Sequence, residues 1–142
     1  MADLASRLTS AAIAVAACLA LSGCQGKRLG QCNALVGVMN EHAARQGIPT
    51  ERDPAKWRVL ARELDLAVQE VERVELTIEE LKGFRAQYRR VMEEFAQVAR
   101  DAATGFETGD QGKVQVANQA VQKLPQRHTE VVEALNRFCQ GR

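Results

Sequence analysis

Apolar residues recur every three or four positions through most of this chain, and this spacing restricts it to helices that pack side by side. One run consists of Trp57, Leu60, Leu64, Ala67, Val71 and Val74. A second run, in a shifted register, consists of Phe84, Tyr88, Val91, Phe95, Val98 and Ala102. A third consists of Val114, Ala117, Val121, Leu124, His128, Val131, Leu135 and Phe138. Side chains at this spacing share one face of an α-helix, so the chain is predicted to be all-α.

Turn residues separate these runs from an earlier helical segment. A first helix is expected over about 31–46, because Gly47 can cap its end and Pro49 prevents it from continuing. Asp53 and Pro54 indicate the start of a second helix. The carboxylate can accept bonds from the free amides of a helix start, and proline fits the first helical turn.

The number of helices depends on the region near residue 77. Thr77 and Glu80 have the spacing of a capping box, in which two side chains bond to free amides at a helix start. A break here, together with the glycine-rich turn at 109–112, gives four helices. Without the break, one helix of about 50 residues would leave only three. Pro125 is expected to kink the last helix without ending it, because the apolar spacing resumes beyond it.

The first 23 residues differ from the rest of the chain. They contain every serine, and an apolar stretch over residues 8–21 follows the weakly basic start at Arg7. This stretch is shorter than the about 20 residues of a membrane span and has the length of a secretion-signal core. Directly behind it, Leu21-Ser22-Gly23-Cys24 resembles the lipobox of bacterial lipoproteins. The alternative is a buried N-terminal helix that ends in cysteine by coincidence.

The resemblance implies that residues 1–23 are a signal peptide that is removed. It also implies that the Cys24 thiol carries diacylglycerol and that the new amino terminus carries a further acyl chain such as palmitate. Gln25, in place of an aspartate, implies an outer-membrane location, on either face. Several acyl chains are enough for stable anchoring, so membrane lipid is an expected partner. Residues 24–30 are expected to be a lipidated tether, and residues 31–142 the folded domain.

Two cysteines remain once Cys18 is removed and Cys24 is acylated. Cys32 and Cys139 lie near the two ends of the mature domain and are expected to pair in an oxidising periplasm. Closing so long a loop stabilises a fold by about 4–5 kcal/mol in the chain-entropy model. A metal or redox site is the alternative, but neither cysteine belongs to a Cys-x-x-Cys pair.

The predicted disulfide and the predicted break near Thr77 support each other. In an up-down-up-down bundle of four helices, the start of the first helix and the end of the fourth lie at the same end. Three helices would separate Cys32 from Cys139 by tens of ångströms. The predicted fold is therefore an antiparallel up-down-up-down four-helix bundle closed by one disulfide. The pattern also loosely resembles small helical lipoproteins of Gram-negative bacteria that carry paired N- and C-terminal cysteines, which implies a fold and a location but no activity.

No catalytic constellation is evident in the mature part of the chain. It has no serine nucleophile, and the formal net charge of +1 argues against a nucleic-acid partner. A di-iron bundle needs Glu-x-x-His motifs, and neither His42 nor His128 has a glutamate three residues before it. We therefore expect a protein that is not an enzyme and has no catalytic residues, metal site or cofactor.

Three groups of residues have functional interpretations beside ordinary structural ones. His128 follows Pro125 on the apolar face, and is either a core histidine or, with Tyr88, the lining of a small ligand cavity. A basic stripe of Lys82, Arg85 and Arg89 is either solvated and neutralised by nearby glutamates or faces lipid headgroups. The turn before the last helix is either an ordinary exposed turn or a partner surface, and Phe106 beside it either closes the core or projects as a contact residue. The residues of this predicted partner surface are Phe106, Glu107, Asp110 and Lys113.

The function predicted from the sequence is a membrane-anchored envelope lipoprotein that acts as a non-enzymatic structural or interaction module. Another envelope protein is its expected protein partner. The alternative is a periplasmic ligand-binding or sensory bundle with a cavity near His128.

Overall fold

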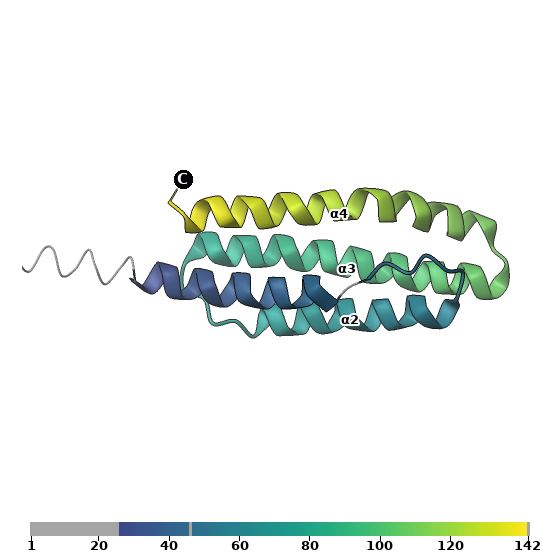
Figure 1. The fold of residues 1–142 in the computed structure, drawn as a ribbon, viewed down its shortest axis with the longest axis horizontal. Helices are drawn as coiled ribbons and strands as arrows, with labels where there is room; N and C mark the ends of the chain where they lie inside the picture. The colour runs from purple at the N-terminus through teal and green to yellow at the C-terminus, as the bar shows by residue number, and fades with distance from the viewer. Residues whose placement is uncertain (1–25, 46, 142) are drawn as a thin grey trace, which may run out of the picture.

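The computed structural model describes residues 26–45 and 47–141, and these residues form a bundle of four helices. The first helix is described over residues 26–45. It is followed by α2 (Pro54–Glu72), α3 (Glu79–Thr108) and α4 (Gln111–Cys139). Successive helices run in opposite directions, and the start of the first helix lies at the same end as the end of α4 (Figure 1). The predicted up-down-up-down four-helix bundle is confirmed.

The four helices differ in length, and extended segments make up the difference. α3 and α4 have 30 and 29 residues and form a long hairpin, whereas α2 has only 19. The first helix lies toward the end where α4 finishes, and the segment after it continues along the bundle to the start of α2 (Figure 1). We call the end with Cys32 and Cys139 the disulfide end, and the end with the α3–α4 turn the turn end.

The core follows the three apolar runs of the sequence. Every residue of those runs is buried or partly buried. The positions of α2 and α4 that lie outside the runs are mostly exposed. Alanines at buried positions of α3 bring its neighbours close. Gly105 has the same role at the turn end, because a Cβ atom there would lie 3.0 Å from the Val114 side chain.

The predicted start of α2 is confirmed, and the predicted turn at 109–112 holds two further caps. The Asp53 carboxylate accepts a hydrogen bond from the Ala55 amide at 2.9 Å, and Pro54 begins α2. Gly109 ends α3 in the left-handed conformation, with φ of 70°. Asp110 then caps α4 by accepting from the Lys113 amide at 3.1 Å. α4 continues through Pro125, as expected from the apolar spacing beyond it.

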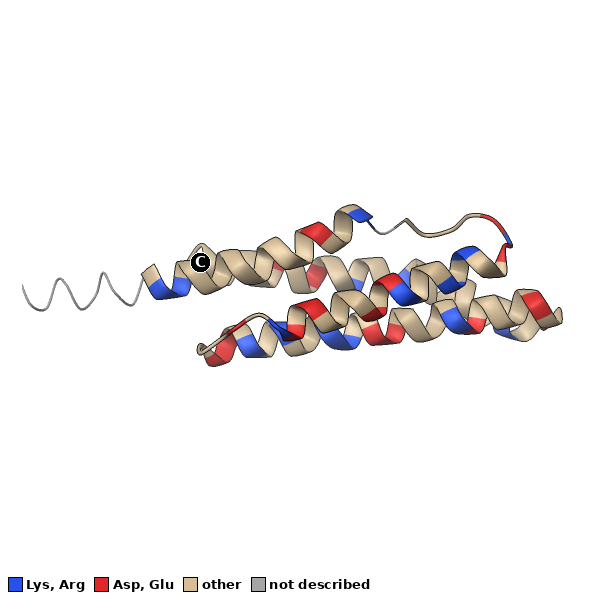
Figure 2. Cartoon of the chain, turned by 90° about the horizontal axis from the view of Figure 1, so that it is seen from below, with Lys and Arg blue, Asp and Glu red and all other residues tan. Residues whose placement is uncertain are grey.

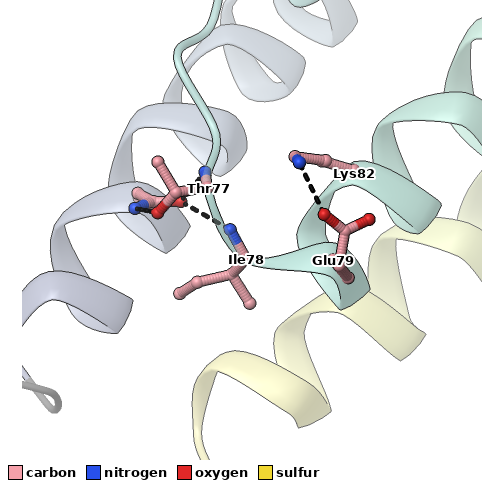
Figure 3. A network of polar contacts seen from close by, with 5 residues as sticks. Thr77, Ile78, Glu79 and Lys82 are labelled. Atoms are coloured by element: carbon pink, nitrogen blue, oxygen red, sulfur yellow. Dashed lines mark hydrogen bonds and ion pairs between the residues drawn. The ribbon is translucent and has the colours of Figure 1, made fainter.

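The start of α3 differs from the predicted capping box. The N-cap is Ile78, which makes no side-chain cap bond. Instead, the Gln31 side chain of the first helix accepts hydrogen bonds from the amides of Thr77 at 2.8 Å and Ile78 at 3.3 Å. Its Nε2 also donates to Thr77 Oγ1 at 2.8 Å (Figure 3). The break is where the sequence places it, but a neighbouring helix supplies the cap.

The expected tether over residues 24–30 is corrected in its described part. Residues 26–30 are helical and continue directly into the predicted first helix. Two glycines disfavour a helix here by about 1 kcal/mol each. Tertiary contacts offset this cost, because Arg28 lies over the Phe138 ring of α4 at 5.9 Å and Gln31 bonds to the α2–α3 connection. Residues 26–30 therefore belong to the first helix and not to a tether.

Candidate functional site

The disulfide end is the most strongly cross-linked part of the described structure. Cys32 and Cys139 form the predicted disulfide, with a Cα–Cα distance of 5.8 Å. Cys32 is buried in the core cluster, and Phe138 packs against Phe84 of α3 with ring centroids 5.7 Å apart. With the Gln31 bonds to Thr77 and Ile78, these contacts join the first helix to α3 and α4.

The predicted lipidation site borders this end of the bundle. Cys24 itself lies outside the described residues. In the sequence, Gln25 alone separates it from residue 26, the first described residue of the helix. Two residues of fully extended chain span about 7 Å at most. A lipid on Cys24 would therefore attach next to the part of the bundle that the disulfide and Gln31 hold in place.

Tyr88 and His128 lie together, as one interpretation of the sequence required. Their ring centroids are 5.5 Å apart, with a tilt of 57° between the planes. Tyr88 is only 1% exposed, its hydroxyl has no hydrogen-bond partner among the described residues, and burial raises its pKa to about 12. Burial also lowers the pKa of the partly buried His128. Both side chains are therefore uncharged near neutral pH.

A second buried histidine was not identified from the sequence. His42 of the first helix is 1% exposed, and its Nε2 lies 2.9 Å from Glu70 Oε2 of α2. The spacing from Cys32 through Leu35 and Met39 to His42 is three, four and three residues, which would have placed it on the buried face. His42 and Glu70 join two helices that are adjacent in the sequence.

The basic stripe is paired with acidic and backbone groups. Lys82 Nζ lies 2.6 Å from Glu79, and Arg89 lies 3.7 Å from both Glu72 and Glu93. Arg85 donates hydrogen bonds to the carbonyls of Val74 at 2.9 Å and Glu72 at 3.3 Å, where α2 ends. These contacts support the solvated, neutralised interpretation of the stripe over a contact with lipid headgroups.

The predicted partner surface is only partly available for contact at the turn end. Phe106 is partly buried against the core, and its ring lies 6.1 Å from that of Trp57, because α2 begins at this end. Glu107 forms an ion pair with Arg58. Asp110 caps α4, and Lys113 is exposed. Phe106 therefore closes the core, which is one of its two interpretations from the sequence, and the other interpretation, a projecting contact residue, is corrected.

Exposed apolar side chains are the surface features that were not singled out from the sequence. Leu29 is 55% exposed and Val116 65%, and Ile48, Val59 and Leu66 are also exposed. Ile48 and Val59 border an open groove of about 360 Å³ between the 47–51 segment and α2. The signal was present for Val59, Leu66 and Val116, since each lies outside the apolar runs that form the core.

The described residues give no indication of a metal centre or a membrane-crossing element. In residues 26–45 and 47–141, no three His, Cys, Asp or Glu side chains gather closely enough to hold an ion. None of the helices in these segments is both long enough and apolar enough to cross a bilayer.

Comparison of the chain with protein-family models, with curated proteins and with solved structures gives no significant match. The functional interpretation therefore depends on the geometry of the bundle and on the sequence that precedes it.

Proposed function

We propose that this chain is a lipid-anchored lipoprotein of the bacterial outer membrane and acts as a non-enzymatic interaction module. The observation that carries the proposal is the Cys32–Cys139 disulfide, since structural disulfides persist in oxidising compartments such as the periplasm. The lipobox-like sequence that ends at Cys24 supplies the means of export and attachment. Because that cysteine is two positions before residue 26, the lipid would hold the disulfide end against the bilayer.

The turn end is the part of the bundle that this attachment leaves accessible. At 1.5 Å per residue, the 30 residues of α3 separate the two ends by about 45 Å. The exposed side chains at the turn end include Val116 and Lys113 of α4. Together with Asp110, they border a shallow hollow that we propose as the contact surface for another envelope protein.

The anchoring proposal is tested by replacing the candidate lipid-bearing cysteine in the full chain. Wild-type protein should partition into the membrane fraction, and mass spectrometry should find an acylated Cys24 at its amino terminus. Cys24→Ala should leave the protein soluble or unprocessed. The matched control is Cys18→Ala, which should be processed normally. A mature wild-type protein that is water-soluble with an unmodified Cys24 thiol contradicts the proposal.

The contact surface is tested by crosslinking in intact cells followed by mass spectrometry. Val116→Glu should reduce crosslinks to envelope proteins, because a charge would replace an exposed apolar contact. Leu66→Glu on α2 is the matched control, since it changes an exposed apolar residue on another face. Unchanged crosslinks in Val116→Glu, with losses in Lys82→Glu and Arg89→Glu, would place the contact on the basic stripe and contradict the proposal.

A further inference from the structure

Leu29 is exposed at the part of the bundle that lies nearest to the proposed lipid. It is 55% exposed and three positions beyond residue 26, the start of the described helix. Those three positions rise about 4.5 Å along a helix. Adding at most about 7 Å for the two residues back to Cys24 keeps Leu29 within roughly 12 Å of the acylated cysteine. This distance is comparable to the depth of a headgroup layer plus the upper acyl chains.

The contacts of neighbouring residues fix the direction of Leu29. Cys32 is buried and bonded to Cys139, and Gln31 is bonded to Thr77 and Ile78. Arg28 lies over the Phe138 ring. These contacts prevent the helix from rotating about its axis, so Leu29 cannot turn into the core. Its exposure is therefore a property of the folded end and not of a loose terminus.

The charge pattern of the first helix is suited to a lipid surface. Lys27 is exposed at its start, and residues 29–40 contain no Asp, Glu, Lys or Arg. Figure 2 shows this uncharged stretch between the basic start of the helix and its first acidic position, whereas both charge signs are distributed along the other helices. Uncharged surface next to a basic residue can enter the interface without desolvating a charge, and lysine is attracted to anionic headgroups.

We propose that the first turns of this helix form a membrane-contact surface, with Leu29 at the boundary between headgroups and acyl chains and Lys27 at lipid phosphate. This inference rests on the proposed acylation of Cys24. It goes further by giving the bundle a fixed contact with the bilayer in addition to its covalent lipid. Val116, at the opposite end, is a matched exposed apolar residue that cannot reach the same bilayer surface at the same time.

The test uses the acylated protein purified from membranes and placed in vesicles of phosphatidylcholine and phosphatidylglycerol, with or without brominated acyl chains. Leu29→Trp should lose a clear part of its added fluorescence in brominated vesicles, because a ring at the headgroup–acyl boundary lies next to the acyl chains. Val116→Trp should lose none. Trp57, which is buried near the turn end, gives an unquenched background in every variant.

The outcomes separate this inference from the anchoring proposal. Mass spectrometry of the same sample reports acylation of Cys24, and an acylated protein whose Leu29→Trp fluorescence is unquenched overturns the membrane contact alone. A protein that lacks the acyl group overturns both proposals. Adding Lys27→Glu to Leu29→Trp should reduce quenching in vesicles with phosphatidylglycerol but not in pure phosphatidylcholine. If adding Lys27→Glu changes the quenching by the same amount in both vesicle types, the contact of Lys27 with anionic phosphate is overturned.

Discussion

His42 and Tyr88 are both buried, but their polar atoms are accommodated differently. His42 Nε2 has a partner in Glu70 at 2.9 Å, whereas the Tyr88 hydroxyl has none among the described residues. A buried polar group without a partner keeps the cost of losing its bonds to water, which is about 1–3 kcal/mol. His42 therefore contributes to helix pairing through a specific bond, and Tyr88 contributes through the packing of its ring against His128.

Tyr88→Phe should leave stability unchanged or raise it by up to about 1 kcal/mol, because it removes an unpaired hydroxyl and keeps the ring. The free energy of unfolding from urea denaturation checks this. Tyr88→Ala is the control for the ring and should lower stability by about 3–5 kcal/mol. A clear loss of stability in Tyr88→Phe would indicate that the hydroxyl has a bonding partner and would contradict this prediction.

His128 should make the stability of the bundle depend on pH in mildly acidic solution. Burial lowers its pKa below the ordinary value of 6.5, so the unfolded chain binds this proton more readily than the folded chain. Stability should therefore decrease as the pH falls below about 6.5 and stop changing, for this group, below the folded pKa. Urea denaturation at several pH values, with His128→Gln as comparison, measures the contribution. Parallel pH profiles of the two proteins would contradict it.

At the scale of helices, periodicity was sufficient to predict where most elements lie and which faces they bury. Trp57, Leu64 and Val71 are buried as their spacing indicates, and the chain breaks near Thr77. The cap at that break was not predictable, because Gln31 is 46 residues away from Thr77 in the sequence. Local patterns report only on neighbours along one helix, so a cap donated by another helix leaves no local signal.

Gln31→Ala should lower the free energy of unfolding by about 1–2 kcal/mol, because two backbone amides lose their acceptor. Glu80→Ala is the matched comparison and should have little effect, since the structure has no capping box at Thr77. Urea denaturation of both variants measures the difference. A larger loss from Glu80→Ala than from Gln31→Ala would restore the local cap that the sequence pattern suggests.

At the scale of the whole molecule, the cysteine pair and the helix count were predictable together. An even number of helices was needed to bring Cys32 to Cys139, and both features are present. Which side chains are exposed and available as contact residues was less predictable. For Phe106 the sequence leaves open whether the ring closes the core or projects as a contact residue, and in the structure it packs on Trp57. The sequence gives no signal for Leu29 as a contact residue, because its glycine-containing segment predicts a tether.

Replacing both Cys32 and Cys139 with serine should lower the free energy of unfolding by about 4–5 kcal/mol, the value for a loop of this length. The disulfide joins residues 107 positions apart, so it restricts almost the whole unfolded domain. Urea denaturation measures the change, and wild-type protein treated with a reductant is the control for the substitutions themselves. A loss below about 1 kcal/mol would show that helix packing alone determines the stability of the fold.

The same disulfide also makes the domain a closed covalent ring. Every peptide bond between Cys32 and Cys139 lies inside this ring, including those of the connecting segments 47–53 and 73–78. One cut by a protease in either segment opens the ring but releases no fragment, because both pieces stay joined through the sulfur atoms. If Cys24 carries the lipid, the cut protein also remains attached to the membrane. The disulfide thus allows the domain to survive a single backbone cleavage without being shed.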